Sequence, residues 1–165
     1  SGTAVSRYAQ SQTTSGGTVT NPANALNTPD GILCVMPNAS TFLNLKLQDT
    51  IPSGTLVTLR VSKTGSGTAT ANINTSINGL SYAAASTLST SSTSLTDIAF
   101  TTNASTNYIQ FQRTGSTTLN IDGITYQFAP LIWTIKDSSV CYTGTPLFKT
   151  GSDANNDGRP DAYPT

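Results

Sequence analysis

Oxygen-bearing side chains recur at alternate positions near the end of the sequence. Asp153, Asn155 and Asp157 occupy positions 1, 3 and 5 of a loop whose sixth residue is Gly158. Calcium binds about six to eight hard oxygens, and glycine at the sixth position lets such a loop bend sharply enough for alternate residues to converge. The spacing therefore predicts a calcium site. Its expected ligands are Asp153, Asn155, Asp157, the Arg159 carbonyl and Asp161.

The twelfth position of this loop departs from the pattern. Pro164 stands where a complete loop carries a further carboxylate, so groups elsewhere or beyond Thr165 would have to finish the site. The alternative interpretation is a solvated linker rich in Asp and Asn. If the site does bind calcium, the segment from Gly151 should order with the metal, because its carboxylates repel one another without it.

Catalytic chemistry finds little support in the residue types. The chain contains no histidine, which removes Ser-His-Asp and Cys-His arrangements and the usual zinc sites. No phosphate-binding glycine motif is present. A pair of aspartates could act as in glycosidases, but no spacing favours such a pair over carboxylates in turns. We therefore expect a protein that is not an enzyme.

Composition narrows the classes of partner and the cellular location that we expect for this protein. Charged residues make up 10% of the 165 residues and the net charge is zero, so nucleic acid and anionic membranes are poor candidate partners. No apolar run approaches the roughly 20 residues that span a bilayer. A chain made soluble by hydroxyl groups rather than by charge is typical of an extracellular or cell-surface protein. In that setting the two cysteines, Cys34 and Cys141, are expected to form a disulfide. Two buried free thiols are the alternative.

The strongest apolar pattern, from Thr41 to Ser62, predicts two strands. Leucines alternate with polar residues in its first half, and Val57, Leu59 and Val61 alternate with polar residues in its second half. The Pro52-Ser53-Gly54 turn between them suggests that the two strands pair antiparallel. The residues expected in the core are Leu43, Leu45, Val57, Leu59, Val61, Ile109, Phe111 and Ile121.

Further short strands are expected at intervals of about ten residues, separated by glycine-rich turns, and no helix is convincing. The Asp122-Gly123 pair inside the last clear strand, 119–128, suggests a β-bulge. The stretch 80–96 is expected to hold one short strand near 81–83 and an exposed loop. We predict an all-β, antiparallel sandwich or jelly roll at residues 1–136, a linker at 137–150 and a partial calcium repeat at 151–165.

The order of several segments resembles a known family. The loop NPANALNTPDG (21–31) is followed by LVTLRVS (56–62), NGLSY (78–82), YIQFQRTG (108–115) and NIDGITYQF (120–128). Together they resemble the galactose-binding-like β-sandwich of secreted and surface proteins of bacteria, especially Bacteroidetes, over about residues 15–128. The ending Gly-Arg-Pro-Asp at 158–161 resembles thrombospondin type 3 calcium repeats, which often follow other domains of such surface proteins.

The resemblance implies a non-catalytic module that binds carbohydrate or another surface ligand, in adhesion or within a secreted enzyme, beside neighbouring domains of a longer chain. The alternative is a structural spacer or assembly unit without a small ligand. Tyr82, which follows Asn78 and Gly79 in a loop, is the best candidate for contact with a sugar. The resemblance also implies that Asp30 could join a structural calcium site, although the turn that Asp30 forms with Gly31 is the favoured explanation. The remaining aromatic candidates, each expected more often in a core or at an edge, are Tyr108, Tyr126, Trp133 and Tyr142.

Overall fold

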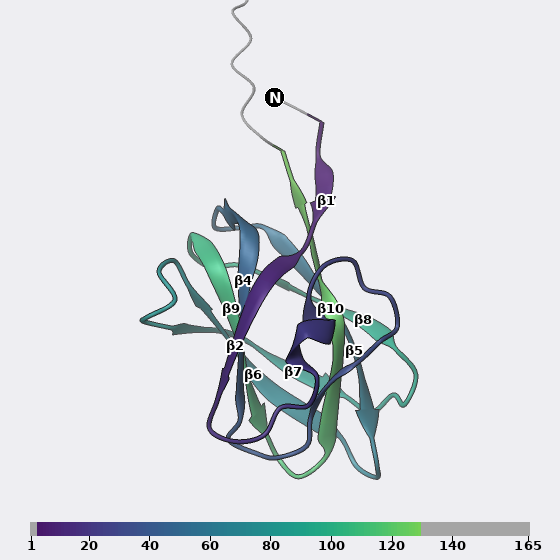
Figure 1. Ribbon diagram of the computed structural model, residues 1–165. Coiled ribbons are helices and arrows are strands. Elements are labelled where there is room, and N and C mark those ends of the chain that lie inside the picture. Colours follow the sequence, from purple (N-terminus) through teal and green to yellow (C-terminus); the bar gives the residue numbers. More distant parts are fainter. Residues whose placement is uncertain (1–2, 130–165) are drawn as a thin grey trace, which may run out of the picture. The chain divides into compact units, whose positions relative to one another are not determined.

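The computed structural model describes residues 3–129, which fold into two antiparallel β-sheets packed face to face (Figure 1). All of the described residues lie within one compact unit, Ser1–Pro130. The strands are β1 (Val5–Arg7), β2 (Ala9–Ser15), β3 (Cys34–Met36), β4 (Phe42–Ile51), β5 (Leu56–Thr64), β6 (Ala69–Ser76), β7 (Ala83–Thr90), β8 (Thr96–Thr101), β9 (Thr106–Thr114) and β10 (Thr118–Phe128). A single turn of 3-10 helix, Pro22–Ala25, lies between β2 and β3.

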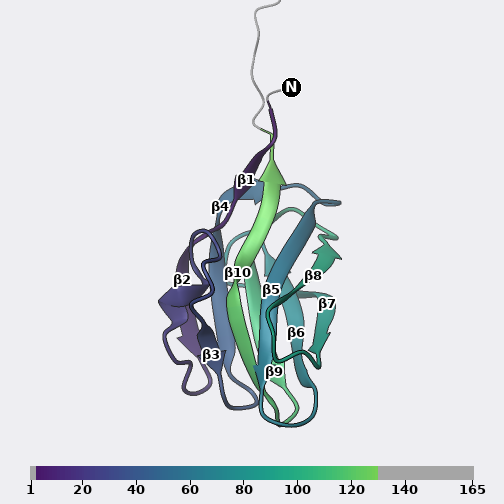
Figure 2. The ribbon, with the colours of Figure 1, turned by 90° about the vertical axis from the view of Figure 1, so that its right-hand side faces the viewer.

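The two sheets have five strands each. Sheet A has the order β1-β10-β5-β8, with β3 pairing beside β1 along β10, and sheet B has the order β2-β4-β9-β6-β7. Figure 2 shows β10 and β5 side by side in one layer. The all-β sandwich expected from the sequence is confirmed.

The alternation of apolar and polar residues explains both layers. Along β4, every second residue from Leu43 to Leu47 is fully buried, while Asn44 and Lys46 face outward. A strand places successive side chains on opposite faces, so this pattern gives β4 one core face and one wet face. All eight residues expected in the core are buried, each with no more than 1% of its surface exposed.

The pairing of the central strands differs from the prediction. β4 and β5 are consecutive, yet β4 pairs with β2 and β9, whereas β5 pairs with β10 and β8. The Pro52-Ser53-Gly54 turn therefore carries the chain from one sheet to the other. The buried faces of the two strands meet across the core rather than side by side, which satisfies the same alternation.

The bulge expected at Asp122-Gly123 is confirmed by a register shift in the β10–β5 pairing between Ile121 and Gly123. The buried Asp122 side chain accepts hydrogen bonds from the backbone N–H groups of Asp30 and Gly31, at 3.1 and 2.8 Å. Its second oxygen lies 3.1 Å from Nε of Arg60. The bulge thus holds the loop before β3 against sheet A.

The segment expected to be mainly an exposed loop is also different. Residues 83–90 form a full edge strand, β7, paired with β6. Within this Ala, Ser and Thr sequence, Leu88 is the buried large apolar side chain. Cross-strand pairing, rather than a strong apolar period, determines this strand.

The structure does not support the expected disulfide. Within residues 3–129, Cys34 on β3 is a free thiol with no exposed surface, and it packs within the core. Because disulfide-bonded cysteines have Cβ atoms about 3.8 Å apart, a partner would have to enter that core. Cys141 lies outside the described residues, as do the linker, the calcium loop and the predicted boundary at 136. Among residues 3–129 we find no helix long and apolar enough to cross a membrane.

Candidate functional site

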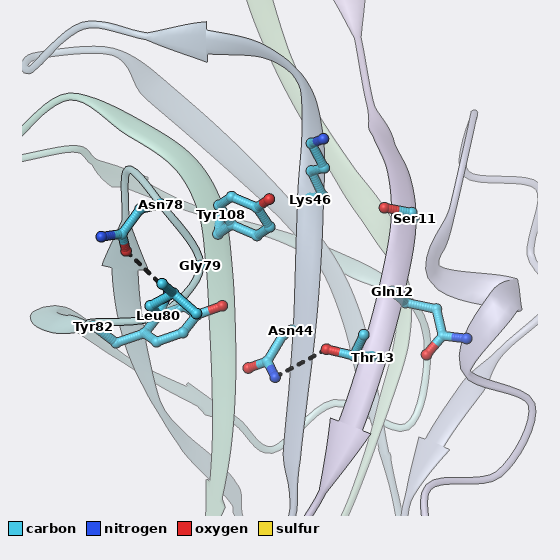
Figure 3. A pocket seen from close by; sticks show the side chains of 10 residues that line it. All are labelled: Ser11, Gln12, Thr13, Asn44, Lys46, Asn78, Gly79, Leu80, Tyr82 and Tyr108. Carbon is cyan, nitrogen blue, oxygen red and sulfur yellow. Dashed lines mark hydrogen bonds between the residues drawn. The ribbon is translucent and has the colours of Figure 1, made fainter.

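A groove of about 240 Å³ lies on the outward face of sheet B, on the side away from the core. Its floor comes from β2, β4 and β9, and the loop between β6 and β7 forms one wall (Figure 3). The lining residues are Ser11, Gln12, Thr13, Asn44, Lys46, Asn78, Gly79, Leu80, Tyr82 and Tyr108. The groove therefore combines hydroxyl, amide and aromatic side chains.

The loop that forms the wall is fixed by its own hydrogen bonds. The Asn78 side-chain oxygen accepts from the backbone N–H groups of Leu80 and Ser81, at 2.9 and 3.1 Å. The Ser76 hydroxyl oxygen accepts from the N–H groups of Asn78 and Gly79, at 3.2 and 2.9 Å. These bonds give Asn78 a role in holding the loop, and they leave Leu80 with 88% of its surface exposed at the rim.

Gly79 brings this loop onto the Tyr108 ring. Its φ angle is +73°, a left-handed conformation that favours glycine, and a Cβ added there would lie 2.9 Å from the Cε1 and Cζ atoms of Tyr108. Tyr82 follows in the same loop and is half-buried. Burial raises the pKa of the Tyr82 phenol, and the neighbouring Tyr108 phenol raises that pKa further. Tyr82 is therefore a neutral hydrogen-bond donor at physiological pH.

Lys46 lies opposite Tyr108 in the pairing of β4 with β9. Its Nζ atom is 6.0 Å from the centroid of the Tyr108 ring, within the range of a cation–π interaction. Both side chains line the groove, so the ammonium group lies near an aromatic ring there (Figure 3).

A ladder of amides continues from the groove across the same face. Asn74 on β6 donates to Gln110 on β9 at 2.8 Å, and Gln110 donates to Asn44 on β4 at 2.9 Å. Asn44 donates in turn to the Thr13 hydroxyl on β2 at 3.2 Å. We call these four residues, Thr13, Asn44, Gln110 and Asn74, the amide ladder. It spans four strands of sheet B.

The amide ladder keeps hydrogen-bonding capacity for a ligand. A primary amide has two N–H donors and an oxygen with two lone pairs. In the ladder, Asn44 and Gln110 each use one N–H donor and one lone pair of the oxygen. Each therefore retains one N–H donor and one lone pair for a ligand. A sugar hydroxyl also donates and accepts, and the face of a sugar ring packs well on an aromatic side chain. The arrangement is suited to a ligand with many hydroxyl groups.

Catalytic or metal-binding chemistry has no comparable basis in this groove. None of its lining residues is Asp, Glu, Cys or His. Among residues 3–129 there is also no group of three or more such side chains that could hold a metal ion.

The predicted contacts separate into those in the groove and those elsewhere. Tyr82 and Asn78 both line the groove, and their roles in ligand binding stay predictions. Tyr126 is buried in the core. Asp30 accepts a hydrogen bond from the N–H of Ile32 at 2.9 Å, which is the turn-shaping role, and its calcium role stays a prediction. The calcium loop, Trp133 and Tyr142 lie outside the described residues.

Lys46 and the amide ladder were missed by sequence analysis. They are outward-facing polar residues drawn from four strands, and only the register of β2, β4, β9 and β6 brings them together. A second hollow of about 190 Å³ on sheet A is lined by Thr, Gln and the exposed Leu56, together with the buried Tyr126. That hollow has no charged lining residue.

The sequence matches no protein-family model and no curated protein. Solved structures do share the fold. The CBM32 domain of AlyQ in complex with 4,5-unsaturated mannuronic acid superposes with a TM-score of 0.56 at 15% identity, covering 73% of this chain and 96% of that one. A truncated AlyQ with CBM32 and alginate lyase domains gives the same TM-score and identity over 79% of this chain, which spans 35% of that two-domain protein.

A pectin-binding carbohydrate-binding module is also similar. It gives a TM-score of 0.54 at 18% identity, with 76% of this chain and 95% of that chain covered. At these identities the likeness establishes the fold alone, an antiparallel β-sandwich that these carbohydrate-binding modules share. The relationship to Bacteroidetes-type proteins and the thrombospondin-type repeat stay predictions.

Proposed function

We propose that this chain is a non-catalytic carbohydrate-binding module that holds a glycan against the outward face of sheet B. The observation that carries the proposal is the groove, in which Tyr108 and Tyr82 lie beside an amide ladder with unused donors and acceptors. The fold shared with carbohydrate-binding modules adds support. The absence of histidine from the chain argues against the Ser-His-Asp and Cys-His hydrolytic mechanisms.

The module would act as part of a larger extracellular or cell-surface protein. A similar fold is joined to an alginate lyase domain in AlyQ, and a binding domain of that kind can hold an enzyme near its substrate. The calcium loop at 153–161 would stiffen the connection to a neighbouring domain.

A glycan array probed with the full chain in the presence of calcium tests the proposal. We expect consistent binding to a set of related polysaccharides and loss of that binding in Tyr82→Ala. Tyr8→Ala is the matched control, because Tyr8 is a half-buried tyrosine outside the groove. Absence of binding across a broad panel, with self-association of the chain instead, would favour the structural spacer.

A further inference from the structure

The charge of the groove narrows the class of glycan. Residues 3–129 contain five basic side chains: Arg7, Lys46, Arg60, Lys63 and Arg113. Four of them have an acceptor within the fold. Arg7 pairs with Asp49 at 2.8 Å and Arg60 with Asp122 at 3.1 Å.

The other two acceptors are backbone carbonyls. The Lys63 ammonium donates to the carbonyl of Gly65 at 2.6 Å, and Arg113 Nε donates to the carbonyl of Thr117 at 2.9 Å. Among the described residues Lys46 has neither an ion pair nor a hydrogen-bonded acceptor for its ammonium, and its neighbour is the Tyr108 ring. It is also the one charged residue that lines the groove.

An anion bound at Lys46 would not be repelled, because none of the neighbouring groove residues is negatively charged. The neighbouring groove residues are Ser11, Thr13 and Asn44, which are neutral and can donate hydrogen bonds to oxygen. A hydrogen bond between an ammonium and a carboxylate is stronger than one between neutral groups, and it discriminates against ligands that lack the charge. Because the groove has a single ammonium group, it can pair with the carboxylate of one sugar unit.

We infer that the groove selects acidic polysaccharides, with the carboxylate of a uronic acid bound at the Lys46 ammonium and its ring beside Tyr108. This inference rests on the proposed function and adds the ligand class to it. The carboxylate of a uronate is attached directly to the sugar ring, so a cation beside an aromatic surface can be reached while the ring packs on that surface. The amide ladder would take the hydroxyls of the neighbouring units.

Matched pairs of polysaccharides test the inference with the full chain. Polygalacturonate, alginate and glucuronoxylan are each compared with the same polymer after chemical reduction of its carboxyl groups, by affinity electrophoresis and calorimetry. We expect at least one acidic polymer to bind about tenfold more tightly than its reduced form, a difference of about 1.4 kcal/mol. Added salt should reduce that preference.

Variants of Lys46 test whether its ammonium group causes the preference for the acidic polymer. Lys46→Met keeps the apolar stem and removes the charge, so it should bring the ratio of the affinities for the acidic and the reduced polymer close to one. Lys46→Arg should retain the preference. Lys63→Met is the matched control and should behave as the wild type, because Lys63 lies outside the groove.

The possible failures are distinguishable. Equal binding of acidic and reduced polymers through Tyr82 would overturn the uronate assignment and leave the carbohydrate-binding function intact. Stronger binding of a sulfated galactan than of every uronate polymer would overturn the assignment to carboxylate. Binding of no polysaccharide at all would overturn both proposals.

Discussion

Tyr126 on β10 and Asp49 on β4 are hydrogen-bonded in both directions across the two sheets. The Tyr126 hydroxyl donates to Oδ2 of Asp49, and the Asp49 backbone N–H donates to the Tyr126 hydroxyl oxygen, both at 3.0 Å. Arg7 on β1 adds bonds to both carboxylate oxygens at 2.8 and 3.3 Å. This cluster ties the ends of three strands together at one end of the sandwich.

Tyr126→Phe should lower the free energy of unfolding by about 1–3 kcal/mol, because it leaves the Asp49 N–H without a partner and removes one of the two hydrogen bonds to Oδ2 of Asp49. Urea denaturation measures the change. Tyr108→Phe is the control and should cost little, since the Tyr108 hydroxyl makes no hydrogen bond within residues 3–129. Equal losses in the two variants would show that the cross-sheet bonds contribute nothing.

Alkaline pH should destabilise the protein through Cys34. Burial raises the pKa of its thiol from 9.0 to about 12. The folded state therefore keeps the thiol protonated while the unfolded chain ionises it, so the stabilising contribution is complete below pH 9.0 and is lost as the pH rises toward about 12. The slope approaches about 1.4 kcal/mol per pH unit.

Denaturation at intervals from about pH 8 to about pH 9.5 measures this slope, in a range below the ordinary pKa of tyrosine. Cys34→Ala should reduce the slope whatever its effect on stability at neutral pH. We also expect two titratable thiols in the denatured, unreduced protein. If no thiol titrates, and the stability of the wild type does not fall as the pH rises, the protein would instead contain the Cys34–Cys141 disulfide that the sequence suggested.

The position of the loop at the groove depends on Gly79. Gly79→Ala adds both a strained φ and a contact 2.9 Å from the Tyr108 ring, so it should displace the loop and weaken glycan binding. Gly54→Ala is the control, with a φ of +87° and no atom within 4 Å of the added Cβ. Both should lose about 1–2 kcal/mol of stability. Binding that falls equally in both variants would contradict the contact with Tyr108.

The local patterns of the sequence were sufficient for the core and for most of the strands, but not for the edge strand β7 or for the pairing of β4 and β5. Leu43 and Leu45 alternate with polar residues whichever neighbour β4 takes, and a Pro-Ser-Gly turn serves a hairpin or a crossing between sheets equally well. Tyr82 could be suggested because it follows a turn signal. The pairing of Lys46 with Tyr108 could not, because it depends on the register between β4 and β9.

The calcium loop gives a prediction that is independent of the groove. Calorimetric titration should show calcium uptake that Asp157→Ala removes, because position 5 supplies a central carboxylate, while Asp30→Ala leaves it unchanged. The chain used should extend past Thr165, since Pro164 leaves the last ligand position empty. Magnesium should substitute poorly, because it requires a tight octahedron at about 2.0–2.1 Å. Uptake abolished by Asp30→Ala rather than by Asp157→Ala would place the calcium site at Asp30 and contradict the predicted site at 153–161.

The most direct test of the account is which face of the sandwich binds the glycan. Calorimetry with the best polysaccharide from the array compares Tyr108→Ala, in the groove of sheet B, with Leu56→Ala, in the hollow of sheet A. We predict that Tyr108→Ala weakens binding by about tenfold or more, or at least about 1.4 kcal/mol, while the variant stays folded, and that Leu56→Ala binds as the wild type does. Full affinity in Tyr108→Ala together with a loss in Leu56→Ala would contradict the assignment of the groove.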